Sequence, residues 1–231
     1  MQGIVLAGGF GTRLRKVVTD VPKPMASIAG RPFLEILLNA MAAKGFTRIV
    51  LSVGFMAEKI SDYFGCEHAG MELVYALEEK PLGTGGGVRL ALSYITEDHV
   101  FVFNGDTFLD LEVNLLERLW QKRKRSVIVG REVPDAERYG RLIANEGVAI
   151  AFSEKNTIGP GLINAGCYLL KRDQLDDFQL GSQFSLETDF LTSAVVRGEF
   201  DVFVTSGLFI DIGIPEDYRL AQVILDKKYL S

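Results

Sequence analysis

The chain has 231 residues, of which 48% are hydrophobic and 24% are charged, with a formal net charge of −5. Such a composition is typical of a globular protein that buries a core without disulfides or metal ions. The acidic balance gives no general attraction to nucleic acids or anionic membranes, so neither is expected as a partner. No apolar run reaches the roughly 18 residues of a membrane span, and no charged region precedes the apolar start, which together predict a cytoplasmic protein.

Short β-branched runs alternate with helical segments in the first half of the chain. Strands are predicted at 3–7, 48–53, 71–77 and 99–104, and helices at 33–45, 56–65 and 85–95. Glycine closes the first two helices, at Gly45 and Gly65, because it readily adopts the left-handed conformation that ends a helix. The alternation predicts an α/β fold, with a Rossmann-like, mainly parallel sheet flanked by helices.

The second half is richer in strands. Strands are predicted at 126–132, 141–152, 161–170, 200–206 and 207–213, and helices at 185–198 and from Pro215 onward. The basic run KRKR (122–125) follows a predicted helix ending at Trp120, and we interpret it as a solvated helix end, with a polyanion site as the alternative. No linker or repeat is present, so one compact domain over 1–231 is expected.

Four loops follow predicted strands and are rich in glycine or carboxylates: AGGFGTR, EEKPLGTGGG, NGDT and DIGIPEDY. Ligands of open parallel sheets bind beyond the carboxyl ends of the strands. The convergence of these loops at one edge therefore predicts the binding site.

The first loop suits a polyphosphate. Gly8, Gly9 and Gly11 allow backbone N–H groups to turn toward an anion, and Arg13 adds a planar fork for phosphate oxygens. Leu14 stands where a dinucleotide-binding turn has its third glycine, and Gly11-Thr12-Arg13 is not the Gly-Lys-Ser/Thr that ends a P-loop, so both of those motifs fail. Proline on both sides of Lys23 predicts an extended, rigid presentation of its ammonium group. A plain glycine-rich turn is the alternative.

The stretch LAGGFGTRLRKVVTDVPKPM (6–25) closely resembles the signature of the sugar-1-phosphate nucleotidyltransferases, G-G-x-G-T-R-L followed by P-K-P. The likeness continues through PLGTGG, NGD, FSEK, NAGCY and DIGIPEDY, and so spans nearly the whole chain. It implies a GT-A-like nucleotidyltransferase sheet with a β-rich sugar-binding lobe. Residues 1–110 would mainly bind nucleotide, and 111–231 mainly the sugar phosphate together with a second metal aspartate.

The resemblance implies an enzyme that joins a sugar 1-phosphate to the α-phosphorus of a nucleoside triphosphate and releases pyrophosphate by direct displacement. Arg13 would hold the pyrophosphate, and Lys23 would lie at the α-phosphate or the attacking phosphate. Arg15 is a further candidate for phosphate contact, whereas Lys16 is expected to be solvated. The expected nucleotide-binding residues at the strand ends and in the glycine loop are Leu6, Ala7, Gly8, Gly9, Gly11, Thr12 and Asn104.

The metal aspartates of the family match Asp106 and Asp211. Each follows a predicted strand, and carboxylates are ligands for Mg²⁺ whose shell substrate phosphates complete. Asp110 competes for this role, and a turn or capping role is the alternative for Asp106.

Base selection is expected in EEKPLGTGGG, where Glu78 or Glu79 could accept two adjacent guanine donors, and Gly83, Thr84 and Gly85 would approach the base. The stretch resembles the guanylyltransferase branch, which implies GTP. Two solvated loop carboxylates are the alternative.

The sugar side is implied by FSEK, INAGCY and RYGRL. Glu154 would accept from sugar hydroxyls and Lys155 would hold the sugar phosphate, although the family's following proline is absent here. The remaining sugar-phosphate candidates are Gly140, Asn164 and Gly166. Glu187 and Asp189 could reach the sugar, but capping of a helix that begins at Ser185 is favoured.

The overall pattern is similar to that of short bacterial family members that act on D-glycero-D-manno-heptose 1-phosphate with GTP. A mannose-1-phosphate guanylyltransferase and a uridylyl- or thymidylyltransferase of the same fold are the alternatives. A GT-A-type glycosyltransferase is disfavoured because NGDTFLD lacks a D-x-D motif, and a non-catalytic homologue because Arg13, Lys23, Asp106 and Asp211 are all present. The sequence does not determine the oligomeric state, and a homodimer is compatible with it.

Overall fold

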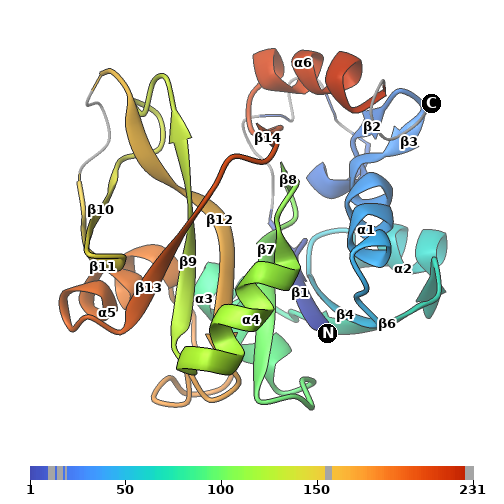
Figure 1. Cartoon of the computed structure of the whole chain (residues 1–231). Coiled ribbons are helices and arrows are strands. Elements are labelled where there is room, and N and C mark those ends of the chain that lie inside the picture. The colour runs from blue at the N-terminus through green and yellow to red at the C-terminus, as the bar shows by residue number, and fades with distance from the viewer. Residues whose placement is uncertain (10–13, 15–17, 19, 154–157, 227–231) are drawn as a thin grey trace.

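The computed structural model describes residues 1–9, 14, 18, 20–153 and 158–226 (Figure 1). A ten-stranded sheet runs through the molecule in the order β10-β11-β13-β9-β12-β7-β1-β4-β6-β5. In chain order these strands are β1 (Gln2–Leu6), β4 (Arg48–Val53), β5 (Glu67–His68), β6 (Met71–Leu77), β7 (His99–Asn104), β9 (Ser126–Val133), β10 (Leu142–Asn145), β11 (Val148–Phe152), β12 (Gly161–Lys171) and β13 (Phe200–Thr205). Strands from both halves of the chain therefore share one sheet.

The predicted mainly parallel α/β sheet is confirmed. Strands β6, β4, β1 and β7 run parallel to one another, as the alternation of strands and helices requires. The β-rich half adds β12, which is antiparallel to both β7 and β9, while β13 runs parallel to β9. Because β12 runs opposite to β7, the start of β12 lies at the carboxyl end of β7.

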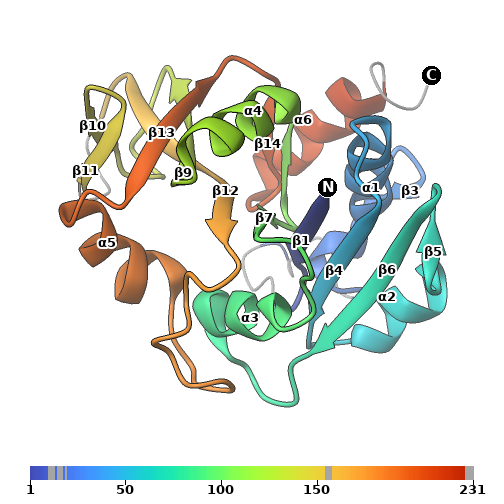
Figure 2. The same cartoon turned by 60° about the horizontal axis from the view of Figure 1, so that its bottom comes forward.

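Helices cover both faces of the sheet (Figure 2). Side chains of α1 (Phe33–Ala43), α2 (Ala57–Phe64) and α4 (Val113–Arg123) share one buried cluster. Those of α3 (Gly83–Leu92), α5 (Thr192–Val196) and η3, a π-helical segment (Leu186–Leu191), share the other. Neighbouring β1 residues point to opposite clusters, Val5 to the first and Ile4 to the second. The predicted glycine ends of the first two helices are confirmed, because Gly45 and Gly65 have φ of 87° and 63°.

A two-stranded ribbon of β8 (Thr107–Leu109) and β14 (Phe209–Asp211) stands beyond the end of β7, at the top of Figure 1. The sequence did not predict strand β8, because its residues were assigned to a loop. Phe108 and Ile210 of the ribbon pack in a third buried cluster with Ala221 and Leu225 of α6 (Pro215–Leu225). The short strands β2 (Ser27–Ile28) and β3 (Arg31–Pro32) form a separate pair.

The basic run 122–125 stands at the end of α4 and is exposed at 122–124, as predicted, and two of its arginines also form ion pairs. Arg123 and Arg125 each place Nε 3.1 Å from a carboxylate oxygen of Asp201, which is buried in β13. Because an unpaired buried carboxylate is destabilising, we expect these two arginines to contribute to stability. This pairing argues against the polyanion alternative.

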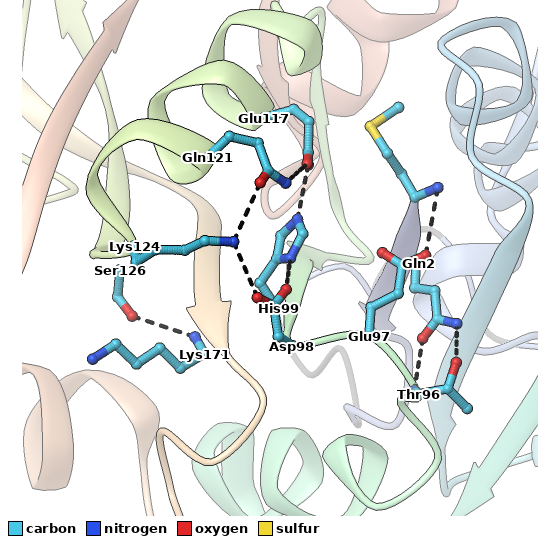
Figure 3. A network of polar contacts seen from close by, with 11 residues as sticks. Gln2, Thr96, Glu97, Asp98, His99, Glu117, Gln121, Lys124, Ser126 and Lys171 are labelled. Carbon is cyan, nitrogen blue, oxygen red and sulfur yellow. Dashed lines mark hydrogen bonds and ion pairs between the residues drawn. The ribbon is translucent and has the colours of Figure 1, made fainter.

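A polar network closes the amino end of β7 (Figure 3). His99 is buried, and its Nδ1 lies 2.5 Å from Asp98 Oδ1 while its Nε2 lies 2.8 Å from Glu117 Oε2. Its ring stacks on Trp120 with centroids 4.7 Å apart. The hydrogen bond from His99 lowers the pKa of Asp98, with a smaller contribution from Lys124. The network therefore ties α4 to the sheet at the edge opposite the carboxyl ends of the parallel strands.

Replacing Asp98 by asparagine is expected to reduce stability only where Asp98 is ionised. Its folded-state pKa is lowered, so its contribution is complete above the unfolded pKa of about 3.9 and is lost as pH falls through the folded value. Because the carboxylate is largely exposed, we expect wild type to melt no more than about 4 °C above Asp98→Asn at pH 6. Melting temperatures measured from pH 7 to pH 2 should converge below pH 4. A constant difference down to pH 2 would contradict this.

No helix in the described part of the chain has both the length and the apolar content needed to cross a membrane.

Candidate active site

The carboxyl ends of the parallel strands gather the predicted loops. Leu6 at the end of β1 pairs with Ser52 of β4 and with Asn104 of β7. The segments that follow β1 and β7 remain adjacent one residue beyond the strands, because Gly105 N donates to Leu6 O at 3.0 Å. Antiparallel β12 brings Asn164 and Gly166 to the same edge. The first and third loops therefore begin side by side, as predicted, and the second begins at the end of β6, one strand beyond β4 in the sheet.

A cavity of about 630 Å³ opens at this edge, a volume within the usual range for small-molecule sites. Several of its walls come from the predicted sugar half and from the β8–β14 ribbon. It is lined by Asn104, Asp106, Thr107, Arg138, Tyr139, Gly140, Phe152, Ser153, Asn164, Ala165, Gly166, Tyr168, Glu187, Thr188, Thr192, Phe209, Asp211, Gly213 and Ile214. Asn104, Asp106, Gly140, Asn164, Gly166 and Asp211 were site candidates from the sequence.

The ribbon places the two candidate metal aspartates next to each other. Asp211 ends β14 opposite Thr107, the residue after Asp106, and Ile212 N donates to Asp106 O at 2.9 Å. Burial and the neighbouring Asp106 carboxylate raise the pKa of Asp211, opposed by Lys23 and by the Gly213 N–H. Two like charges held this close favour a cation between them.

Lys23 lies at the same pair. Its Nζ is 2.5 Å from Asp106 Oδ2, and its side chain is only 12% exposed. The predicted extended presentation is wrong, because Lys23 begins a 3₁₀ turn, η2 (Lys23–Met25), closed by a hydrogen bond from Met25 N to Pro22 O at 2.8 Å. Pro24 fits this first turn because no N–H is required there. The prolines still fix the backbone, in a turn rather than a strand.

The two aspartates suit a divalent metal ion. They offer hard oxygen ligands on the wall of the cavity, and Mg²⁺ commonly takes one or two carboxylates with phosphates and water completing its shell. Within the described ranges no group of three or more His, Cys, Asp or Glu residues is arranged for a metal. Asp110, the competing candidate, does not line the cavity, and its Oδ1 accepts from Lys44 Nζ at 2.8 Å. The donor set therefore fits an ion shared with a phosphate substrate.

The nucleotide candidates near β1 are described in part. Leu6, Ala7, Gly8 and Gly9 follow or end β1, and Gly9 is exposed. Gly11, Thr12 and Arg13, like Arg15 and Lys16, lie outside the described residues.

Glu78 is held in place beside the first loop. Its Oε1 accepts from Ser52 Oγ at 2.9 Å and its Oε2 from Leu82 N at 3.0 Å. A Cβ on Gly8 would lie 2.7 Å from Glu78 Oε1, so Gly8 is needed for this close approach. Glu79 is exposed. The alternative of two solvated loop carboxylates does not describe Glu78.

The glycine-rich start of α3 packs on another part of the chain. A Cβ on Gly83 would lie 2.5 Å from Phe184 O, and one on Gly85 would lie 2.2 Å from the Phe184 ring. Gly85 N also donates to Phe184 O at 3.0 Å, and Phe184 N donates to Leu82 O at 3.0 Å. Packing against Phe184 thus explains why Gly83 and Gly85 carry no side chain, and the sequence alone did not reveal this cause.

The sugar candidates described by the structure line the cavity. Gly140 has φ of 75° and Gly166 has φ of 68°, conformations that favour glycine. Asn164 Nδ2 donates to the Tyr168 hydroxyl at 2.7 Å, and Asn164 Oδ1 accepts from Gly166 N at 3.0 Å, which fixes the amide orientation. Glu154 and Lys155 lie outside the described residues.

Sequence reasoning missed Arg138 and Tyr139, although both are in the quoted RYGRL stretch. Arg138 contacts Asp217 of α6 at 2.6 Å and the Tyr139 hydroxyl at 2.7 Å, and both residues line the cavity. A charged residue and an aromatic directly before Gly140 were the available signal.

The whole length of the chain resembles known proteins. The model of the family described as "Nucleotidyl transferase" matches residues 2–228. The chain is 38% identical over 223 residues to D-glycero-alpha-D-manno-heptose 1-phosphate guanylyltransferase of Aneurinibacillus thermoaerophilus, covering 96% of this chain and 97% of that protein. The solved structure of HddC from Yersinia pseudotuberculosis complexed with GMP-PN superposes with a TM-score of 0.85 at 38% identity, covering 96% of this chain and 97% of that one. Mannose-1-phosphate guanylyltransferase of Mycobacterium tuberculosis is 33% identical, but the match covers 94% of this chain and 62% of that enzyme.

Proposed function

The chain belongs to the nucleotidyl transferase family, and we propose that it joins GTP to a sugar 1-phosphate, giving a GDP-sugar and pyrophosphate. The observation that supports this most is that Asp106 and Asp211 lie together on the cavity wall and that Lys23 forms an ion pair with Asp106. The sugar we propose is D-glycero-α-D-manno-heptose 1-phosphate, on which the relative from Aneurinibacillus thermoaerophilus acts by name. Nearly equal lengths of the two chains support extending that substrate to this one.

The reaction is a direct displacement at phosphorus. An oxygen of the sugar phosphate attacks the α-phosphorus of GTP, the new P–O bond forms, and the bond to the β,γ-pyrophosphate breaks. Two anions must approach each other, so catalysis depends on alignment and on neutralisation of charge. Lys23, held by Asp106, would stabilise the charge that develops on the α-phosphate oxygens. Arg13 would hold the departing pyrophosphate, and backbone N–H groups of Gly8, Gly9 and Gly11 would contact the triphosphate.

Mg²⁺ is the proposed cofactor, with Asp106 and Asp211 as its protein ligands. When bound it would neutralise phosphate charge and orient the phosphates of the substrates. Lys23 pairs with Asp106 Oδ2, Thr107 Oγ1 donates a long hydrogen bond of 3.3 Å to Asp106 Oδ1, and Gly213 N donates to Asp211 Oδ1 at 2.7 Å. The remaining lone pairs of the two carboxylates are the proposed metal ligands.

The guanine base would bind between the end of β6 and the start of α3. The fixed carboxylate of Glu78 and the exposed carboxylate of Glu79 are candidates to accept from the two adjacent guanine donors. Gly83, Thr84, Leu6, Ala7, Thr12 and Asn104 complete the proposed nucleotide site. On the sugar side, Glu154 and Lys155 would bind hydroxyl and phosphate groups, next to Gly140, Asn164 and Gly166.

Residues 1–110 would thus mainly bind nucleotide, and 111–231 would mainly bind the sugar phosphate and supply Asp211, within one domain. Because GTP is a metabolite of the cytoplasm, we place the reaction there. A GDP-sugar of this kind serves as a donor for surface polysaccharides.

A matrix of triphosphates against sugar 1-phosphates tests the proposal. Purified protein with Mg²⁺ would be mixed with each of GTP, UTP, dTTP and CTP, and with manno-heptose, mannose and glucose 1-phosphates, and pyrophosphate release would be followed. We expect the highest kcat/KM for GTP with the heptose. Turnover with UTP or dTTP but not GTP would overturn the base assignment. A preference for mannose 1-phosphate would favour the second candidate function, that of a mannose-1-phosphate guanylyltransferase. The Mycobacterium tuberculosis enzyme of that name is 33% identical to this chain over 94% of this chain's length.

A further inference from the structure

A carboxylate for which the sequence favoured helix capping over a sugar contact lines the cavity. Glu187 lies in the first turn of η3 and is half-buried. It shares the cavity wall with Asn164, Tyr168 and Thr188. The segment that carries it is π-helical, a geometry often found at functional sites.

Helix capping does not require Glu187. The capping expectation is confirmed for Asp189, whose Oδ2 accepts from Ser185 N at 2.7 Å, while Ser185 Oγ accepts from Thr188 N at 3.2 Å. These two bonds satisfy the donors of the first turn in the manner of a capping box. For Glu187 the expectation is wrong, because its carboxylate accepts from the hydroxyl groups of Thr84 and Ser185 and not from a backbone N–H of the first turn.

One oxygen of Glu187 is fixed and the other is open. Oε2 accepts from Thr84 Oγ1 at 2.7 Å and from Ser185 Oγ at 3.1 Å. Thr84 Oγ1 itself accepts from Leu186 N at 2.9 Å, so its proton is directed to Glu187. Among the described residues, Oε1 of Glu187 has no hydrogen-bond donor, and no cation pairs with the carboxylate.

The charge of Glu187 determines which part of a sugar phosphate it can face. An unpaired carboxylate repels phosphate but accepts strong, charge-assisted hydrogen bonds from hydroxyl groups. Burial, and to a smaller extent Glu187, raise the pKa of the neighbouring Tyr168 phenol, so that hydroxyl stays neutral beside it. The wall near Glu187 therefore suits the hydroxyl-bearing part of a sugar.

We propose that Glu187 accepts a hydrogen bond from a sugar hydroxyl through Oε1 and so contributes to the choice of sugar, with Thr84 as the residue that positions it. This inference rests on the proposed function. The hydrogen bond between Thr84 and Glu187 links the proposed nucleotide site to the proposed sugar site. Thr84 belongs to the glycine-rich start of α3, which packs on Phe184.

Glu187→Gln tests the acceptor role, because the amide keeps the size of the side chain but offers N–H₂ in place of one oxygen. We expect kcat/KM for the sugar 1-phosphate to fall about 10- to 100-fold, as for loss of a hydrogen bond to a charged group. The KM for GTP should change less than about twofold. A panel of monodeoxy sugar 1-phosphates gives a second readout: wild type should discriminate strongly against one of them, and Glu187→Gln should lose that discrimination.

Asp189→Asn is the matched control, since it alters a carboxylate two residues away that serves the helix cap. It should lower the melting temperature and leave the KM for the sugar 1-phosphate unchanged. Unchanged sugar kinetics and unchanged deoxy-sugar discrimination in Glu187→Gln would overturn the inference, as would a defect confined to the KM for GTP. If wild type turns over no sugar 1-phosphate at all, the proposed function itself fails, and the two failures are thus distinguishable.

Thr84 variants test the positioning role. Thr84→Val removes the hydroxyl and should raise the KM for the sugar 1-phosphate, whereas Thr84→Ser keeps the hydroxyl and should restore it. Deoxy-sugar discrimination should fall in the valine variant and return in the serine variant. Equal kinetics of the two variants would overturn the part assigned to Thr84.

Discussion

Replacing Lys23 by methionine is expected to lower kcat/KM by about 10²- to 10³-fold, the usual effect of removing one donor that stabilises transition-state charge. The ammonium group lies 2.5 Å from Asp106 and is largely shielded from solvent, so its charge acts at short range and with little screening. Methionine keeps most of the aliphatic chain, and we expect only a small change in melting temperature. Steady-state rates of pyrophosphate release at saturating Mg²⁺ measure the effect.

Lys44→Met is the matched control for this experiment. Lys44 also pairs with an aspartate, Asp110, at 2.8 Å, but neither residue lines the cavity. We expect this variant to lose some stability and to retain its kcat/KM. Near-normal activity of Lys23→Met, or an equal loss in both variants, would refute a chemical role for Lys23.

Replacing Asp211 by asparagine is expected to raise the Mg²⁺ concentration that gives half-maximal activity by at least about tenfold, because loss of even an outer-shell partner of a metal ligand costs 10- to 100-fold. Asparagine keeps an oxygen that can accept the 2.7 Å hydrogen bond that Gly213 N donates to Asp211 Oδ1. It removes the charge that faces Asp106, so folding should be preserved or improved. Activity titrated with Mg²⁺, and melting temperature without metal, measure the two effects.

Asp110→Asn is the control here, because Asp110 was the competing ligand. It should leave the Mg²⁺ titration unchanged and lower stability through the loss of its bond with Lys44. A shifted titration in Asp110→Asn together with a normal one in Asp211→Asn would exchange the roles of the two residues.

Local patterns were sufficient for most of the sheet and its helices. Strands β1, β4, β6 and β7 are rich in apolar and β-branched residues, and the ends of α1 and α2 follow from glycines whose backbone conformation excludes most other residues. The three-residue strand β8 escaped prediction because its stability comes from pairing with β14, a contact distant in sequence. Periodicity cannot report such a pairing.

The candidate site was predictable where a residue directly follows a strand, as Asp106 and Asn104 do. It was not predictable where packing sets the role. Gly83 and Gly85 suggested an approach to a base, yet the segment around Phe184 occupies the space that their side chains would need. Glu187 suggested a cap, but Asp189 two residues later satisfies the same donors.

The β8–β14 ribbon also bears on synthesis of the protein. Asp106 emerges from the ribosome well before Asp211, and the two carboxylates become neighbours only when β14 pairs with β8. The acidic pair is therefore complete only in a chain whose synthesis has passed β14. Truncated products that stop before β14 should be catalytically silent even if they retain a nucleotide, which confines turnover to chains whose translation has passed this point.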